Sequence, residues 1–200
     1  NQGVSHLMKK NKIAVHIGAG KVTAPGKLTV EAEGKTTSLE AKHIVIATGA
    51  RARELPKRTG KADGKRIWTY RHAMVPTELP SKLLVIGSGA IGIEFASFYN
   101  DLGSQVTVIE MMDRVVPVED AEVSAFLEKA LKKQGMTIMT GAGVESLKAT
   151  ATGVSATIKD KGGNVATSDF THCIVAVGIV PNTENIGIEA LGVKTTKGHI

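Results

Sequence analysis

The chain is poor in cysteine and in aromatic residues, and each shortage excludes a class of protein. Cys173 is the one cysteine among 200 residues, so a disulfide framework, a CxxC redox pair and a cysteine-rich zinc site are excluded within this sequence. Aromatic residues make up 4% of the chain, and the 25 basic residues are scattered. Because a nucleic-acid surface combines a basic stripe with interleaved aromatics, the net charge of +6 indicates solubility and not nucleic-acid binding.

Long apolar runs and metal-binding patterns are missing as well. No run of about 18 apolar residues occurs, so the sequence predicts no transmembrane helix and no membrane partner. The histidines do not show the spacing of metal ligands, and we expect no metal site. The composition, 42% hydrophobic and 22% charged, predicts a folded chain with a sizeable core.

The ends of the sequence have the pattern of a piece of a longer protein. Asn1 stands in place of an initiator methionine, and no signal-peptide pattern follows it. Residues 197–200 look like a strand that has only begun. We therefore expect further segments before residue 1 and after residue 200.

Residues 1–50 are predicted to be rich in β-structure. Strands are expected over residues 13–20 and 43–49, and four consecutive apolar residues in the second indicate a strand covered on both faces. A turn is predicted at Pro25-Gly26, and Leu28-Thr29-Val30 leads to a predicted hairpin at Glu33-Gly34-Lys35.

Residues 51–80 are basic and interrupted by prolines. The residues concerned are Arg51, Arg53, Pro56, Lys57, Arg58, Pro76 and Pro80. We interpret the segment as a crossing between two domains, with its charges on a solvated surface.

The middle of the chain alternates between strand and helix patterns. Strands are predicted over residues 83–86, 105–110 and 136–139, and helices over 90–102 and from Asp120 to Gly135. Such alternation predicts an α/β fold with a parallel sheet and right-handed crossovers. The second helix is expected to bury Val123, Phe126, Leu127, Ala130 and Leu131.

A set of short strands follows the second helix. They are predicted over residues 144–147, 154–159, 165–169 and 172–178, with a turn at 160–164. Cys173 lies in the last of these apolar strands, where we expect an inert, buried thiol.

The chain contains an echo of itself, because residues 42–49 resemble residues 171–178. Gly87 precedes Gly178 by 91 residues, and the same distance counted back from Gly49 falls before residue 1. If the two segments end related domains, a first nucleotide-binding turn would lie ahead of this chain.

A glycine-rich turn carries the clearest functional pattern. Residues 87–92, Gly-Ser-Gly-Ala-Ile-Gly, fit G-x-G-x-x-G between a predicted strand and a predicted helix. Gly87 permits the tight turn, Gly89 lets the backbone approach a pyrophosphate, and Gly92 lets the helix pack closely. The free N–H groups and the dipole of the helix then favour the anionic phosphates.

Glu110 ends the second strand of this unit, 18 residues after Gly92. A carboxylate at this place accepts both hydroxyls of the adenosine ribose and repels a 2′-phosphate, which favours NAD over NADP. Arg114 lies four residues further on and would favour NADP, but Glu110 occupies the expected strand-end position.

Other residues are weaker candidates. Glu94, in the first turn of the first helix, is either a partner of the helix dipole or a carboxylate near the nicotinamide end of the cofactor. Val144, Val177 and Gly178 lie where backbone groups at strand ends would touch a bound cofactor.

Four motifs in order resemble those of the pyridine-nucleotide:disulfide oxidoreductases. They are residues 46–49, 85–94, 106–110 and 176–183, and the resemblance is most specific from Lys82 to Val193. It implies a Rossmann-like NAD domain inserted in an interrupted FAD domain. Residues 1–72 would end the first FAD segment, 73–178 would form the NAD domain, and 179–200 would return to the FAD domain.

The resemblance also implies the cofactor contacts. Gly20, Thr48, Gly49 and Ala50 would lie along FAD. The residues that would line NAD are Gly87, Ser88, Gly89, Ala90, Ile91, Gly92, Ile93, Glu94, Glu110, Val144 and Gly178. Ile179 stands where the family often has arginine, which alters the local charge but leaves the backbone contact of Gly178 intact.

The activity implied is a relay of electrons from a dithiol through an active-site disulfide and FAD to NAD⁺. The pattern is nearest to the members that oxidise dihydrolipoamide on lipoyl domains, which implies a homodimeric parent in the cytoplasm or the mitochondrial matrix. The FAD phosphate turn, the C-x4-C pair and the His-Glu pair of the family are not in this sequence. We therefore expect the 200 residues to be inactive alone.

Three alternatives stay open. Glutathione, mercuric and trypanothione reductases share the pattern, but most use NADPH and would carry basic residues where Glu110 stands. A catalytically silent dinucleotide-binding module fits the glycine-rich turn as well. A basic adaptor for acidic partners would show a steep salt dependence of binding and no affinity for dinucleotides.

Overall fold

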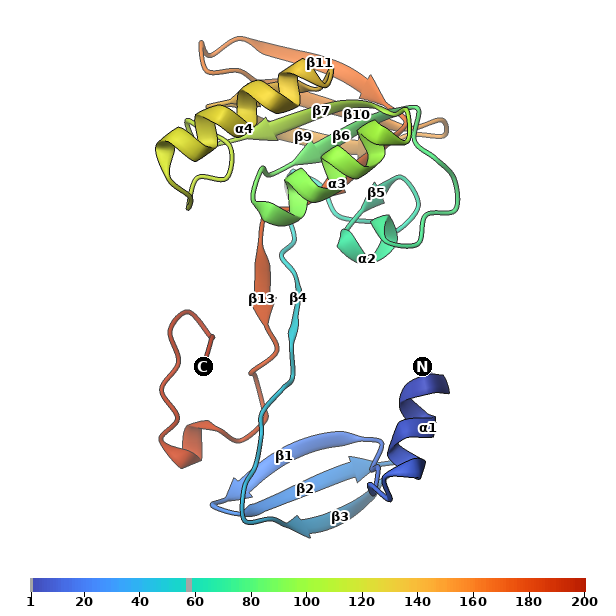
Figure 1. The fold of residues 1–200 in the computed structure, drawn as a ribbon, viewed down its shortest axis with the longest axis vertical. Coiled ribbons are helices and arrows are strands. Elements are labelled where there is room, and N and C mark those ends of the chain that lie inside the picture. The colour runs from blue at the N-terminus through green and yellow to red at the C-terminus, as the bar shows by residue number, and fades with distance from the viewer. Residues whose placement is uncertain (1, 57–58) are drawn as a thin grey trace. The chain divides into compact units, whose positions relative to one another are not determined.

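The computed structural model describes residues 2–56 and 59–200, so the predicted surface charges Lys57 and Arg58 lie outside the described residues. The chain divides into two compact units (Figure 1). Unit 1 consists of residues 1–50 and 181–200, and unit 2 of residues 51–180. Among the described residues, no helix combines the length and the apolar character needed to cross a bilayer.

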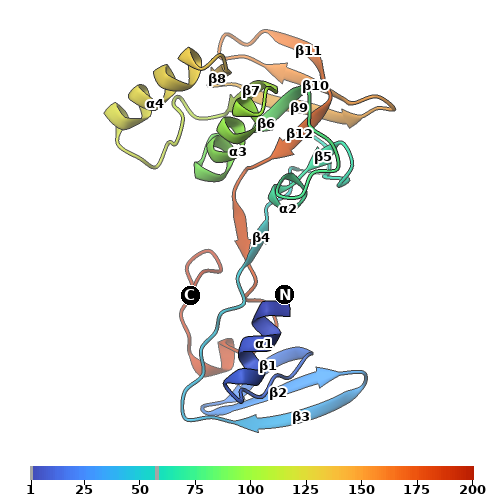
Figure 2. The ribbon, with the colours of Figure 1, turned by 45° about the vertical axis from the view of Figure 1, so that its right-hand side comes forward.

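Unit 1 contains a three-stranded antiparallel sheet in the order β1-β2-β3 (Figure 2). Its elements are α1 (Gln2–Lys10), β1 (Ala19–Ala24), β2 (Lys27–Ala32), β3 (Lys35–Glu40) and the 3₁₀-helix η1 (Glu189–Leu191). The turn predicted at Pro25-Gly26 and the hairpin predicted at Glu33-Gly34-Lys35 are both confirmed. Glu33 and Gly34 both have positive φ, at 51° and 73°, as a two-residue turn between twisted strands requires.

Two expectations for unit 1 are wrong, and one helix was missed. Residues 2–10 form a helix, which the sequence did not predict, and the strand expected over residues 13–20 begins only at Ala19. Residues 43–49 form no strand, and Val45 is 87% exposed. An apolar run becomes a covered strand only where neighbours supply backbone hydrogen bonds and a packing layer, and no described residue does this around Val45.

Unit 2 is built on a five-stranded parallel sheet in the order β5-β12-β6-β7-β8. Its strands are β5 (Ile67–Trp68), β12 (His172–Val175), β6 (Lys82–Ile86), β7 (Gln105–Glu110) and β8 (Thr137–Thr140). The predicted parallel α/β sheet is therefore confirmed. β12 ends at Val175 and is shorter than the expected 172–178, although Ala176 N still donates to Ile86 O at 2.8 Å.

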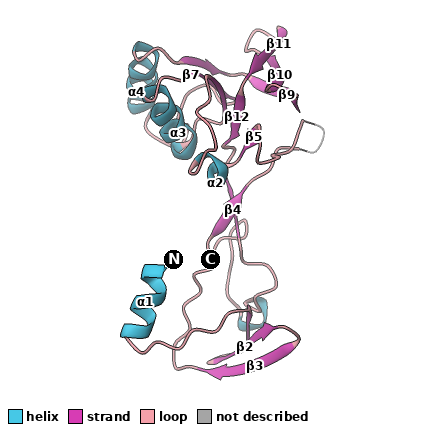
Figure 3. Cartoon of the chain, turned by 90° about the vertical axis from the view of Figure 1, so that its right-hand side faces the viewer, coloured by secondary structure: helices cyan, strands magenta, loops and turns pink. Residues whose placement is uncertain are grey.

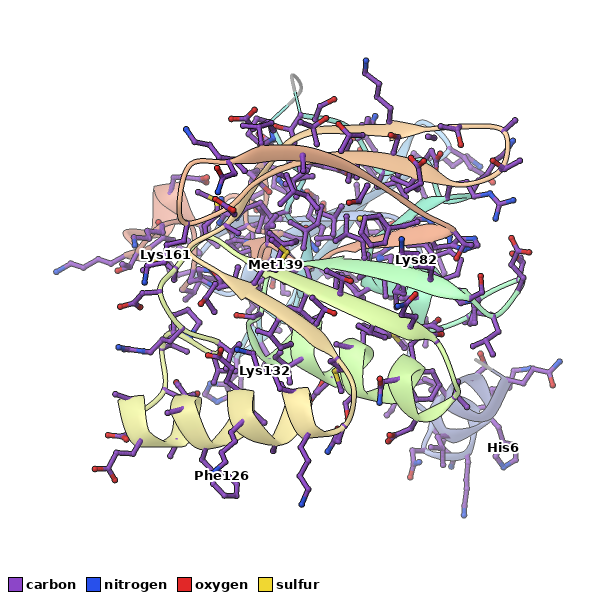
Figure 4. All side chains as sticks on the ribbon, turned by 90° about the horizontal axis from the view of Figure 1, so that it is seen from above. His6, Lys82, Phe126, Lys132, Met139 and Lys161 are labelled. Carbon is purple, nitrogen blue, oxygen red and sulfur yellow. The ribbon has the colours of Figure 1, made fainter. Side chains whose placement is uncertain are left out.

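Two layers cover this sheet, as Figure 4 shows from above and Figure 3 from the side. Helices α3 (Ala90–Asp101) and α4 (Ala121–Lys133) lie on one face, and an antiparallel sheet in the order β11-β10-β9 lies on the other. Its strands are β9 (Gly143–Ala149), β10 (Val154–Lys159) and β11 (Val165–Phe170). A short helix, α2 (Tyr70–Ala73), follows β5.

Alternation along the strands of the parallel sheet divides the core in two. Leu83 and Val85 pack with the helices, whereas Leu84 and Ile86 pack with the antiparallel sheet. Successive side chains of a strand point to opposite faces, so the continuous apolar run of β6 fills both cores. Cys173 is buried in the second core, as predicted, and its burial raises the pKa of the thiol.

The helix predicted after Asp120 is confirmed, but its buried face is partly wrong. The Asp120 carboxylate caps α4 by accepting from Glu122 N at 2.8 Å. Val123 and Phe126 are 54% and 76% exposed, and Phe126 projects away from the sheet in Figure 4. Ser124 is fully buried instead, and its hydroxyl donates to Val116 O. The buried residues of α4 are therefore Ser124 and Leu131, and Leu127 and Ala130 are half-buried.

The chain passes between the two units within a pair of short strands. β4 (Ala50–Ala52) and β13 (Ile179–Pro181) form a two-stranded sheet. The unit boundaries fall after Ala50 and after Val180.

Candidate functional site

A cleft of about 770 Å³ lies in unit 2 at the carboxyl ends of its parallel strands. Residues that follow three adjacent strands line it: Gly87 and Gly89 after β6, Glu110 at the end of β7, and Gly178 after β12. Ligands of open α/β sheets bind in the crevice outside these strand ends. The cleft therefore lies where the topology favours a binding site.

The three glycines of the turn between β6 and α3 differ in their surroundings. Gly87 has a φ of 99°, and a Cβ there would overlap the carbonyl oxygen of Ala176. A Cβ on Gly92 would overlap the carbonyl oxygen of Gly87, so the helix passes directly against the turn. Gly89 has no neighbouring atom within 4 Å of its Cβ position. The first and third glycines serve close packing, and the second leaves open space beside the cleft.

The N-terminus of α3 opens at this turn. Gly89 is the N-cap residue, and among the described residues no side chain caps the helix. The first bond of the helix runs from Ile93 N to Gly89 O at 3.0 Å. The N–H groups of the first turn and the helix dipole together favour an anion at this end. Gly89, Ala90 and Ile91 line the cleft, so such an anion would sit inside it.

Glu110 brings a negative charge to the same cleft. Its Oε2 accepts from both Ser88 N and Ser88 Oγ at 2.8 Å, and its Oε1 accepts from Met112 N at 2.8 Å (hydrogen bonds that compensate its burial). The residue is 8% exposed and still lines the cleft. The carboxylate is thus held in a fixed place beside the glycine-rich turn.

The far wall of the cleft includes Val144, Val177 and Gly178. Gly178 has a φ of 106°, and its carbonyl oxygen accepts from Arg53 N at 3.0 Å. The guanidinium of Arg53 donates to Ile179 O at 3.2 Å. A cation from the basic segment therefore lies beside Ile179, the position at which the sequence lacks the expected arginine.

Several predicted site residues lie away from the cleft lining. Ser88, Gly92 and Ile93 are buried behind the turn. Glu94 is exposed and lines a separate cleft of about 290 Å³ together with Met74 and Phe98.

The residues predicted for FAD belong to unit 1, and none of them lines this cleft. Gly20 is an exposed residue of β1 and pairs with Val30. Thr48 and Gly49 are joined to the returning segment, since Asn182 donates to their carbonyl oxygens at 3.1 Å and 3.0 Å. Ala50 begins β4.

An apolar rim of the cleft was missed by the sequence analysis. Met111, Met112, Pro117 and Val118 line it from the segment between β7 and α4. Met111 is 80% and Val118 is 89% exposed. Two methionines directly after a strand-end acid could have indicated this wall, whereas Val115 and Val116 of the same segment are buried in the helix-side core. Exposed apolar side chains beside a polar anchor are typical of sites that receive a flat ring.

Arg114, the residue that would favour NADP, does not line the cleft. It is half-buried, and its guanidinium donates to Pro117 O at 3.1 Å within its own loop. This contact directs the charge to the backbone of the loop, so Glu110 is the charged side chain that the cleft presents beside the turn.

Comparison with known proteins gives consistent matches over the whole chain. The family model described as Pyridine nucleotide-disulphide oxidoreductase matches residues 1–200. A dihydrolipoyl dehydrogenase of Zymomonas mobilis is 51% identical over 99% of this chain and 42% of its own length. One of Rhizobium etli is 46% identical over 100% of this chain and 44% of its own length.

A solved structure agrees with these sequences. The crystal structure of LpdA from Mycobacterium tuberculosis superposes with a TM-score of 0.82 at 32% identity, and covers 98% of this chain and 43% of that one. The chain thus spans less than half the length of the relatives that it matches.

Proposed function

The chain belongs to the pyridine nucleotide-disulphide oxidoreductase family, and we propose that its residues 73–178 are the NAD-binding domain of a dihydrolipoyl dehydrogenase. The observation that carries this proposal is a single cleft lined by both the glycine-rich turn and the carboxylate of Glu110. An uncapped helix start and a strand-end acid are the two groups that a dinucleotide needs for its diphosphate and its adenosine ribose.

The residues of the cleft fit NAD in their chemistry. The turn at Gly87 to Ile91 would hold the diphosphate, because the space at Gly89 is open and the N–H groups of the first turn of α3 would donate to an anion there. Glu110 would accept from the ribose, and its negative charge would repel a 2′-phosphate. Met111 and Val144 would cover the adenine, and the backbone at Gly178 would touch the cofactor beyond the diphosphate.

FAD is the second cofactor that we propose for the whole protein. Gly20, Thr48, Gly49 and Ala50 would contribute to its binding, and Asn182 fixes the backbone at Thr48 and Gly49. When bound, FAD and NAD⁺ supply the redox chemistry that takes electrons from dihydrolipoamide. The parent would be a homodimer that accepts lipoyl domains.

The chain itself binds nucleotide without turning over dihydrolipoamide. Cys173 is its one cysteine, and it is fully buried with a raised thiol pKa, so it can neither pair within the chain nor attack a substrate. The role left to these residues is to bind and orient NAD.

The test is a titration of the purified protein with NADH and with NADPH, followed by nucleotide fluorescence. We expect saturable binding of NADH that is tighter than binding of NADPH. Glu110→Ala should weaken NADH binding by about 1.5–3 kcal/mol, roughly 10- to 150-fold in Kd, because a charged acceptor for the ribose is lost.

The matched control is Glu122→Ala, which removes an exposed acid of α4 outside the cleft and should leave the Kd for NADH unchanged. Equal or tighter binding of NADPH would contradict the proposal and favour a reductase of the glutathione or mercuric type. No binding of either nucleotide would reject the NAD site altogether.

A further inference from the structure

Ser88 is the second residue of the glycine-rich turn, at a position where the motif accepts any residue. Its side chain is fully buried, and it does not line the cleft. It nevertheless makes two hydrogen bonds to one atom: Ser88 N and Ser88 Oγ both donate to Glu110 Oε2 at 2.8 Å. The turn that faces the diphosphate is in this way tied to the acid that faces the ribose.

These bonds determine which part of the carboxylate is available to a ligand. A carboxylate has about four acceptor sites, two on each oxygen. The two on Oε2 are taken by Ser88, and one on Oε1 is taken by Met112 N at 2.8 Å. The acceptor site that is left lies on Oε1, and Glu110 lines the cleft.

We infer that Ser88 is a positioning residue for nucleotide recognition: it holds Oε2 of Glu110, so that the carboxylate binds the adenosine ribose through Oε1 and keeps its charge where a 2′-phosphate would lie. This inference rests on the proposed NAD site. It differs from the sequence expectation, in which both ribose hydroxyls bond to the acid, because one acceptor site serves one hydroxyl.

The physical gain is preorganisation. A free glutamate loses rotamer entropy when it binds a ligand, whereas a carboxylate held by three donors has lost it on folding. A fixed negative charge also discriminates better between NADH and NADPH, because it cannot turn away from the 2′-phosphate of NADPH. Ser88 therefore acts on affinity for NADH and on the exclusion of NADPH, both through Glu110.

The decisive experiment is a double-mutant cycle with Ser88→Ala, Glu110→Ala and the double variant, titrated with NADH. Ser88→Ala leaves the backbone bond and removes the hydroxyl donor, so the Kd for NADH should rise roughly three- to tenfold. In the Glu110→Ala background the same substitution should change nothing, because the group that Ser88 positions is gone.

NADPH separates positioning from general damage. Loss of fold would weaken the binding of both nucleotides equally. A Glu110 carboxylate that Ser88 no longer holds would instead weaken the binding of NADH and exclude NADPH less strongly. The Kd for NADPH divided by the Kd for NADH should therefore be lower in Ser88→Ala than in the unaltered protein. Ser88→Cys, with a weaker donor of similar size, should lie between serine and alanine, and it keeps the test valid if Ser88→Ala fails to fold.

The matched control is Ser104→Ala. Ser104 is also buried, at 4% exposure, and its hydroxyl donates to Pro80 O at 2.6 Å, away from the cleft. Its loss should leave both Kd values unchanged.

The possible results distinguish a failure of the proposed NAD site from a failure of the role assigned to Ser88. An unaltered protein that binds no NADH overturns the proposed function and this inference with it. NADH binding that is equal or tighter in Ser88→Ala, or effects of the two substitutions that simply add, overturns this inference alone.

Discussion

Two segments of similar sequence, residues 42–49 and 171–178, fold differently in the two units. In unit 2, His172 to Val175 form β12, and all four residues are buried between β5 and β6. In unit 1, residues 43–46 form no strand, and Val45 is 87% exposed, whereas its counterpart Ile174 is fully buried. The apolar run is necessary for a buried strand but not sufficient, because neighbouring strands and covering layers decide where it lies.

The cores of the two units differ in the same way. Unit 2 has one apolar cluster on each face of its parallel sheet. The buried apolar residues described in unit 1 are Val22, Val30, Pro181 and Ile188. We therefore expect unit 2 to carry most of the stability of this chain, and the predictions below test that contrast.

The largest expected effect comes from truncating the paired positions of the echo. Ile174→Ala should lower the free energy of unfolding of unit 2 by about 2–5 kcal/mol, because it leaves a cavity in the helix-side core. Val45→Ala should change it by less than about 0.5 kcal/mol, since the side chain is exposed. Hydrogen exchange with mass spectrometry measures each unit separately, and equal losses of protection would break the comparison.

A smaller contrast is expected between two glycines that the resemblance assigns to cofactors. Gly92→Ala places a methyl group against the carbonyl oxygen of Gly87, a backbone atom that cannot move freely. The substitution should lower the free energy of unfolding by about 1–3 kcal/mol. A Cβ at Gly20 would have no atom within 4 Å, so Gly20→Ala should leave the free energy of unfolding unchanged. Urea unfolding followed by circular dichroism would measure both, and a Gly92→Ala variant as stable as the unaltered protein would contradict the close packing of α3 on the turn.

The smallest effect concerns two histidines at equivalent positions of the echo, His172 and His43. His172 is buried against Trp68, with ring centroids 4.4 Å apart, and its Nδ1 has no partner among the described residues. Its Nε2 lies 3.2 Å from Arg66 and 3.3 Å from Glu78, and Asp63 is the further charge that acts on it.

Burial, and then the charge of Arg66, lower the pKa of His172 below its usual value. A lowered pKa means that the unfolded chain binds the proton more readily, so the stability contributed by neutral His172 is present above about pH 6.5 and is lost as the pH falls through the folded-state pKa. Unfolding of unit 2 should become easier as the pH falls below about 6.5, as seen in Trp68 fluorescence. His172→Phe should flatten that profile and His43→Phe should not, and a profile unchanged by His172→Phe would contradict this account.

The sequence predicted unit 2 well because local patterns there agree with the tertiary structure. The cap at Asp120, the glycines that end the helices and the continuous apolar run of β6 each indicated their element correctly. The buried side of α4 could not be predicted in full, because apolar Val123 and Phe126 are exposed while the polar residue Ser124 is buried.

Part of the site was accessible from the sequence and part was not. The glycine pattern and Glu110 were found by spacing, and the structure brings Gly87, Gly89 and Glu110 to one cleft. The bonds of Ser88 to that acid could not be predicted, because the motif sets no requirement at this position. Unit 1 was predicted less well, since the apolar run of residues 43–49 pairs with no strand among the described residues and residues 2–10 are helical.

The central claim is that the turn after β6 holds a diphosphate while Glu110 holds the adenosine ribose. The most direct measurement is a crystal structure of the protein with NAD⁺. The account predicts the diphosphate against the backbone of Gly89 and Ala90 and one ribose hydroxyl on Glu110 Oε1, with Ser88 still bonded to Oε2. Nucleotide bound elsewhere, or a ribose without contact to Glu110, would contradict it.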